Sequence, residues 1–124
     1  MENLKFKAWI KKQNKITEVK AIFFKENNTF VETKHNIYNI KEVHLMQHIG
    51  LKDRNGDEIY EGHILKDIYT GKRSFIHFIN GNFYLIDDGN YFSSLYCLDT
   101  KYYDIAGYVY DDKELLQTID TIKI

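Results

Sequence analysis

Two histidines four positions apart are the first residues in this chain that could hold a metal ion. His44 and His48 have the spacing of zinc ligands on one face of a helix. The residues around them alternate between apolar and polar, which predicts a strand instead. Four residues of a strand span about 13 Å, too far for two imidazoles to share one ion. We therefore expect no metal and no cofactor.

The candidate catalytic groups lack the neighbours that would activate them. Cys97 lies among apolar residues without an adjacent base, which predicts a buried structural thiol. The carboxylates of Asp87 and Asp88 precede Gly89-Asn90, a sequence that is typical of a turn. The glycines lack the lysine and hydroxyl residues of a phosphate-binding loop. The sequence therefore predicts a protein that is not an enzyme.

Aromatic residues, 15% of the chain, carry the clearest signal for binding. The alternation of residues 4–11 places Trp9 outward, beside lysines, unless a second layer covers that face. A tryptophan in that setting suits stacking on single-stranded nucleic acid, or anchoring of a protein interface. Tyrosines on alternate residues, such as Tyr108 and Tyr110, share one face of a strand, so we expect some of them to be exposed. The candidate partner-binding residues are Lys5, Lys7, Trp9, Lys11, Lys12, Arg54, Tyr60, His63, Tyr108 and Tyr110.

The elements that must position these residues are mostly short antiparallel strands. Alternating segments are separated by turn residues along the whole chain, and the clearest hairpin signal is Asn80-Gly81-Asn82 between "SFIHFI" and "FYLID". Gly107 predicts a bulge inside the strand of residues 102–111. Many short strands without βαβ alternation indicate a small barrel or a sandwich.

The pattern changes only at the end of the chain. Asp111 predicts a helix cap, with Glu114 completing a capping box. Leu115, Leu116 and Ile119 form an apolar stripe with helical spacing. We expect one short C-terminal helix.

The net charge argues against two classes of protein, and the charges are unevenly distributed along the chain. The net charge of −1 argues against a nucleic-acid coat and against an acidic DNA mimic. Residues 1–25 carry seven lysines against two acids, whereas residues 82–124 carry three lysines against eight acids. Such a polarity can steer a partner or favour head-to-tail self-association. The alternative is that both regions are simply solvated faces without a partner.

Composition indicates an origin and a compartment. Ile, Lys, Asn and Tyr, which have AT-rich codons, supply 51 of 124 residues, while Pro is absent. A low-GC bacterium or its phage is the economical source. Lysines interrupt every apolar run near the start, and no run approaches the roughly 20 residues of a membrane span. We expect a protein of the host cytoplasm.

Three blocks of the sequence carry a family resemblance. They are "LKFKAWIKKQNKI" at residues 4–16, "LMQHIGLKDRNGDEIYEGHIL" at 45–65 and "YYDIAGYVYDDKELL" at 102–116. Their order and separation resemble those of the YopX-like proteins of phages and prophages. In the central block Gly56 supplies a positive φ, Gly62 relieves a tight turn, and Ile59 and Ile64 point inward. His63 stands where the family has an acid.

The resemblance implies a fold and an origin without an activity. It implies a mostly β fold with an N-terminal β subdomain at 1–48 and an SH3-like barrel with the C-terminal helix at 49–124, packed as one compact unit. It also implies a phage or prophage source. Small barrels of this kind serve as binding modules more often than as catalysts, which is an argument from analogy.

Three functional hypotheses follow. The first is a non-enzymatic interaction protein that binds and modulates or inhibits a host or phage protein, such as a defence protein, with homo-oligomerisation as an option. The second is a nucleic-acid-binding barrel that uses the basic N-terminal strand and Trp9. The third is a sponge for a small ligand or a nucleotide. We expect no membrane partner.

Overall fold

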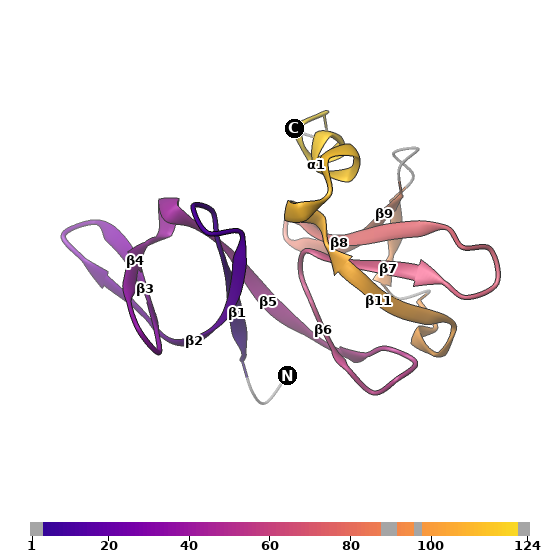
Figure 1. Cartoon of the computed structure of the whole chain (residues 1–124), viewed down its shortest axis with the longest axis horizontal. Helices are drawn as coiled ribbons and strands as arrows, with labels where there is room; N and C mark the ends of the chain where they lie inside the picture. Colours follow the sequence, from indigo (N-terminus) through magenta and orange to yellow (C-terminus); the bar gives the residue numbers. More distant parts are fainter. Residues whose placement is uncertain (1–3, 88–91, 96–97, 122–124) are drawn as a thin grey trace. The chain divides into compact units, whose positions relative to one another are not determined.

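The computed structural model describes residues 4–87, 92–95 and 98–121, and the predictions for Cys97 and for Asp88-Gly89-Asn90 lie outside them. The chain forms two compact units, Met1–His48 and Ile49–Ile124. Within the described residues it is mostly β, with antiparallel strands and one short C-terminal α-helix, as the sequence predicts (Figure 1). No helix among the described residues has the length and the apolar character needed to cross a membrane.

The first unit is built from consecutive antiparallel strands. They are β1 (Phe6–Ile10), β2 (Lys15–Lys25), β3 (Asn28–Thr33), β4 (Ile37–Asn39) and, after the short 3-10 helix η1 (Ile40–Glu42), the long strand β5 (Val43–Lys52). Their order in the sheet is β4-β3-β2-β1-β5, with β6 beyond β5. The β2–β3 turn uses Glu26 and Asn27, both at positive φ, one residue earlier than the predicted Asn27-Asn28.

Burial in the first unit decides between the two predicted positions of Trp9. Ala8 and Ile10 pack with Val31 and Val43, as alternation predicts. Trp9, predicted to point outward with the lysines, is only 5% exposed. Ala8, Trp9 and Ile10 are consecutive and all buried, so both faces of β1 are covered at this end of the strand. Alternation identifies the two faces of a strand but does not tell whether the second face is solvated.

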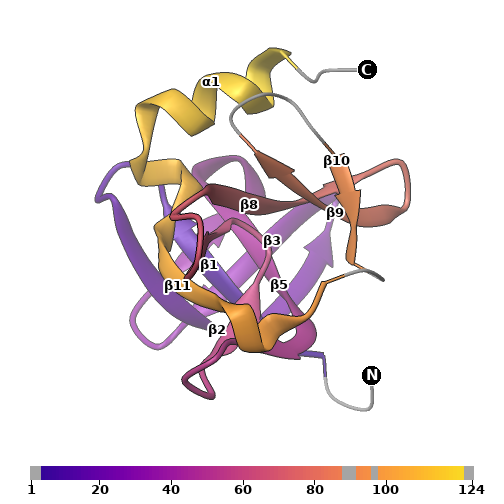
Figure 2. The same ribbon diagram turned by 90° about the vertical axis from the view of Figure 1, so that its right-hand side faces the viewer.

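The second unit contains the remaining strands and the helix. They are β6 (Glu58–Tyr60), β7 (His63–Asp67), β8 (Arg73–Ile79), β9 (Asn82–Asp87), β10 (Phe92–Ser94), the 3-10 helix η3 (Thr100–Tyr102), β11 (Tyr103–Tyr108), the 3-10 helix η4 (Val109–Asp111) and α1 (Lys113–Thr121). The five-stranded sheet has the order β10-β9-β8-β7-β11, and β8, β9 and β10 can be followed in Figure 2. Among the described residues the strand pairing does not close this sheet into a barrel.

Turns and caps follow the local sequence closely. Asn80 and Gly81 both have positive φ between β8 and β9, as a two-residue hairpin requires. Gly107, at φ +126°, lies at the register shift of β11, which confirms the predicted bulge. The helix cap is Asp112 and not Asp111: its Oδ1 accepts a hydrogen bond from the Leu115 amide at 3.1 Å. Asp111 belongs to the preceding 3-10 turn.

The five-stranded sheet is buried on both faces. Ile64, Phe75 and Ile86 pack with Leu115 of α1 on one face. On the other face Leu65, Ile76 and Leu85 pack with Ile59 of β6. The near-continuous apolar segments of β7, β8 and β9 therefore follow from a sheet with two covered faces.

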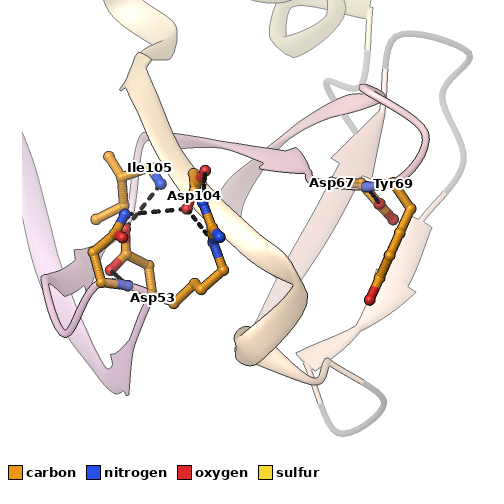
Figure 3. A network of polar contacts seen from close by, with 7 residues as sticks. Asp53, Asp67, Tyr69, Asp104 and Ile105 are labelled. Atoms are coloured by element: carbon orange, nitrogen blue, oxygen red, sulfur yellow. Dashed lines mark hydrogen bonds and ion pairs between the residues drawn. The ribbon is translucent and has the colours of Figure 1, made fainter.

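An aspartate holds the β5–β6 hairpin against the edge strand β11. Asp53 Oδ1 accepts hydrogen bonds from the amides of Asn55 and Asp57, both at 2.9 Å, while Oδ2 accepts one from the Ile105 amide at 3.0 Å. The Arg54 amide donates to the Tyr103 carbonyl at 3.0 Å. Arg54 also pairs with Asp104 through two hydrogen bonds of 2.9 Å, and this network is shown in Figure 3.

Gly62 lets an aromatic ring approach the backbone. Its φ is +89°, and a Cβ at this position would lie 2.7 Å from Cε2 of Tyr110. The Gly62 amide donates to the Ile76 carbonyl and its carbonyl accepts from the Val109 amide, both at 2.8 Å. A side chain at position 62 would therefore separate β8 from η4.

Replacing Gly62 should destabilise the protein by more than the strain of a positive φ alone explains. Gly62→Ala combines a strained positive φ with overpacking against Tyr110, so we expect a loss of about 2–4 kcal/mol in the free energy of unfolding. Gly56→Ala is the matched control, because Gly56 has φ +86° and nothing within 4 Å of its Cβ position. It should cost about 1 kcal/mol. Urea unfolding measures both, and equal losses would contradict the role of Tyr110.

Removing the charge of Asp53 should loosen the hairpin from β11. In Asp53→Asn one carboxylate oxygen becomes an amide group that cannot accept, so at least one buried amide loses its partner, at about 1–3 kcal/mol. Burial raises the pKa of Asp53, but the amides of Ile105, Asp57 and Asn55 lower it below its ordinary value of 3.8.

The stability difference between wild type and Asp53→Asn has a defined pH window. A carboxylate with a lowered pKa in the folded state stabilises the protein above pH 3.8, and this stabilisation is lost as pH falls through the folded pKa. The difference should therefore be full at pH 6 and shrink below pH 4 in urea titrations. Asp57→Asn, an exposed change in the same hairpin, should stay within about 0.5 kcal/mol of wild type. If the difference in unfolding free energy between wild type and Asp53→Asn does not change with pH, the charge of Asp53 does not contribute to stability.

Candidate binding site

A pocket of about 350 Å³ lies where β7 ends and β11 begins. Its lining residues come from two segments: Asp67 and Tyr69 from the end of β7 and the following turn, and Asp99, Tyr102 and Tyr103 from η3 and the start of β11. Strand pairing sets one side of it, because Tyr103 is the register partner of Asp67. Sequence analysis did not select any of these five residues.

The turn after β7 holds Tyr69 in an outward position. Asp67 Oδ1 accepts hydrogen bonds from the amides of Tyr69 at 2.8 Å and Thr70 at 3.1 Å, and the first is drawn in Figure 3. Gly71, at φ +72°, completes this turn, and its amide donates to the Asp67 carbonyl at 2.9 Å. The Tyr69 side chain is 77% exposed as a result.

Tyr102 meets Tyr69 from the other segment. The Asp99 side chain accepts from the Lys101 amide and caps η3, and the Ile68 amide donates to the Tyr102 carbonyl at 3.0 Å. The rings of Tyr69 and Tyr102 have centroids 5.6 Å apart with a tilt of 50°. Two exposed phenol rings therefore form one wall, and the carboxylates of Asp67 and Asp99 belong to the same lining.

A cation of the chain itself already uses this aromatic surface. The Lys101 Nζ lies 5.2 Å from the centroid of the Tyr102 ring and 3.4 Å from Asp99 Oδ2. The hydrogen bond and charge of Asp99 raise the pKa of Lys101, with a smaller part from Tyr102. The nearby Lys72 directs its Nζ to Oδ2 of the buried Asp87 at 2.6 Å.

A second pocket of about 360 Å³ lies on β9 and β10. Its described lining residues are Asn82, Phe83, Tyr84, Ser94 and Leu95, and none of these carries a charge. The Phe83 ring contacts that of the exposed Phe78 at 4.9 Å between centroids. This pocket has fewer groups that would orient a ligand, so the tyrosine pocket is the stronger candidate.

Four of the sequence-selected residues come together, but inside the second unit. Tyr60 and His63 are 5% and 3% exposed. The Tyr60 amide donates to Nδ1 of His63 at 2.9 Å, and the His63 ring lies 5.0 Å from that of Tyr108. Tyr110 packs on Gly62. Their selection as an exposed partner surface is wrong for Tyr60 and His63, because β6 and β7 are core strands.

The other selected residues are scattered or engaged. Lys5, Lys11 and Lys12 are exposed and Lys7 is half-buried in the first unit. Lys11 donates from Nζ to the Lys41 carbonyl at 2.9 Å. With Trp9 buried, the combination of lysines and a stacking ring is lost. Arg54 is exposed but paired with Asp104. His44 and His48 lie on β5, as predicted, and no cluster that could hold a metal ion occurs among the described residues.

A half-buried acid lies beside the Gly62 contact. Glu61 Oε2 accepts a hydrogen bond from the Phe78 amide at 3.1 Å and lies 3.9 Å from Nδ1 of His77. Burial raises the pKa of Glu61 although the Phe78 amide lowers it, and burial lowers the pKa of His77. Burial, and then the Glu61 charge, raise the pKa of the Tyr110 hydroxyl. The raised pKa of Glu61 and the lowered pKa of His77 both disfavour a charged pair between these two residues, so their contact is no salt bridge at neutral pH.

Removing the charge of Glu61 should reduce the dependence of the free energy of unfolding on pH. A carboxyl with a raised folded pKa stabilises the fold fully below its unfolded value of 4.5, and the stabilisation is lost as pH rises through the folded pKa. Glu61→Gln keeps an oxygen for the Phe78 amide and carries no charge. We expect it to be at least as stable as wild type at pH 7 and to lose this relative advantage below pH 4.5.

Urea unfolding between pH 4 and 7 tests this expectation. The charging of His77 below pH 6.5 destabilises both proteins, so the difference between them reports Glu61. Asp57→Asn serves as the exposed control in the same unit. A Glu61→Gln protein that is less stable than wild type at pH 7 by more than about 1 kcal/mol would show that the carboxylate is favourable there.

Comparison with known proteins places this geometry in a family. The chain is similar over 92% of its length to protein EF1440 from Enterococcus faecalis, whose crystal structure matches with a TM-score of 0.60, at 24% identity and over 98% of that chain. At this identity the similarity concerns the fold alone. No curated protein matches the sequence. The model of the family described as YopX protein matches residues 5–117, which include the Asp53 hairpin, Gly62 and the tyrosine pocket. The chain therefore belongs to the YopX family.

Proposed function

We propose that this protein is a non-enzymatic interaction protein of phage or prophage origin. It binds a protein in the host cell and modulates or inhibits it, and a defence protein of the host is a fitting target. The observation that carries the proposal is the exposed surface formed by Ile68, Tyr69 and Tyr102, called the tyrosine patch below.

The composition and rigidity of the tyrosine patch support protein binding. Ile68 and Tyr102 are each 37% exposed and Tyr69 is 77% exposed. Tyrosine is enriched at protein interfaces because its ring buries a large area with few rotatable bonds and its hydroxyl still finds a polar partner. The Asp67 turn and the capped η3 hold the two rings before a partner arrives, which lowers the entropy cost of binding.

Electrostatics favour a protein over a nucleic acid as the ligand of this patch. Asp67 and Asp99 line the adjoining pocket and would repel phosphate groups. The lysines that the sequence analysis selected, Lys5, Lys7, Lys11 and Lys12, lie in the first unit, where Trp9 is buried and cannot stack on a base. The same repulsion disfavours a nucleotide as a small ligand of the pocket.

Affinity purification with matched variants tests the proposal. The tagged chain, incubated in a low-GC bacterial lysate with and without nuclease, should recover one stoichiometric protein that survives nuclease. Tyr69→Ala combined with Tyr102→Ala should lose this protein, because the anchors of the interface are gone. Phe24→Ala is the control: Phe24 is 78% exposed but belongs to β2 of the first unit. It should recover the protein as wild type does.

Three outcomes would contradict the proposal. The first is equal recovery by the double tyrosine variant. The second is a nuclease-sensitive recovery of nucleic acid whose amount falls steeply with salt, which would assign binding to the exposed lysines. The third is a sharp monomer mass by light scattering with no partner recovered. Both tyrosines are exposed, so the double variant should keep the wild-type circular dichroism spectrum.

A further inference from the structure

We propose that the pocket lined by Asp67, Tyr69, Asp99, Tyr102 and Tyr103 receives a basic side chain, an arginine or lysine of the protein partner. This inference rests on the proposed function and names the chemistry that the tyrosine patch recognises. It concerns the second unit alone.

The lining combines the two features that attract a cation. The faces of phenol rings carry a negative quadrupole potential, and a cation within about 6 Å of the ring centroid is attracted to it. The two rings of the wall are tilted by 50° to each other, and both tyrosines are exposed to solvent. The carboxylates of Asp67 and Asp99 add two formal negative charges to the same lining.

One carboxylate oxygen is available to a ligand. Both hydrogen bonds to Asp67 end on Oδ1, from the amides of Tyr69 and Thr70. Among the described residues no hydrogen bond is recorded to Oδ2. An arginine or lysine N–H can therefore donate to this oxygen without opening the turn that holds Tyr69.

Lys101 shows the chemistry of the expected occupant. Its ammonium already lies over Tyr102 and beside Asp99. The two side chains are 67% and 52% exposed, and exposed pairs of this kind contribute little to stability, so an incoming cation can displace Lys101 at small cost. Lys72 does not compete for the same place, because its ammonium contacts the buried Asp87.

The volume and the negative charge of the pocket limit which ligands it can bind. A volume of about 350 Å³ is at the lower end of ligand pockets, which suits one long side chain better than a large cofactor. Two carboxylates oppose anions. A flexible basic side chain with an apolar stem matches the lining, since the stem can pack on the tyrosine rings while the charged end reaches a carboxylate.

A peptide titration tests the inference on the full chain. The probe is a capped pentapeptide with one central arginine flanked by serine and glycine, and the control replaces arginine by citrulline, its neutral isostere. Two-dimensional NMR should show saturable shifts of the Tyr69, Lys101 and Tyr102 amides with the arginine peptide, with a Kd in the millimolar range. The shifts should weaken as salt is raised.

Three variants give the expected changes in Kd. Tyr102→Leu keeps an apolar side chain but removes the ring, and should weaken binding roughly two- to fivefold. Asp99→Asn should weaken it by a similar factor. Lys101→Gln should strengthen it about two- to fivefold, because the internal cation is removed. Phe24→Leu, outside the second unit, should bind as wild type does. Unchanged spectra elsewhere establish that each variant is folded.

The outcomes separate this inference from the proposed function. Equal binding of the citrulline peptide, or weaker binding by Lys101→Gln, would overturn the inference. If the arginine peptide causes no saturable shift while recovery of the partner depends on Tyr69 and Tyr102, the inference fails and the proposed function stands. If the peptide binds as expected while the tyrosine variants recover the partner undiminished, the inference stands and the proposed function fails. Shifts of the same amides with protein concentration alone would assign the pocket to a second copy of the chain and overturn the choice of partner.

Discussion

The carboxylate of Asp53 joins two segments that are about fifty residues apart in the chain. Its two oxygens accept three backbone amides, two within its own hairpin and one from β11. β11 is an edge strand of the five-stranded sheet, and an uncovered edge exposes amides and carbonyls that must find partners. The hairpin supplies these partners through Asp53 and through the Arg54 amide. This contact and the pairing with β7 together hold β11 from its two sides.

The tyrosine pocket is a consequence of that arrangement. One of its segments immediately precedes β11 and the other ends β7, and the pairing of Tyr103 with Asp67 brings them together. Further along, β11 leads into η4, where Val109 bonds to Gly62 and Tyr110 packs on it. Exposed Tyr102 therefore lies just before β11, and the half-buried Tyr108 and Tyr110 lie at its end and just after it.

The distribution of charge agrees with a protein ligand of basic character. Several charged side chains of the second unit form pairs, such as Arg54 with Asp104 and Arg73 with Asp112. The lining of the pocket includes two carboxylates and three tyrosines, and the exposed Lys101 lies beside Asp99.

The sequence by itself determined the local features of this protein. The mostly β class, the Asn80-Gly81 hairpin, the bulge at Gly107 and the inward positions of Ile59 and Ile64 follow from short-range rules of alternation and turn chemistry. The family follows from the resemblance of three sequence blocks. Only the tertiary structure decided which faces are solvated. Trp9 and Tyr60 are buried because their strands have both faces covered, and Tyr69 and Tyr102 meet because β7 pairs with β11. Local alternation cannot reveal either fact, since strand order and layering depend on contacts between distant residues.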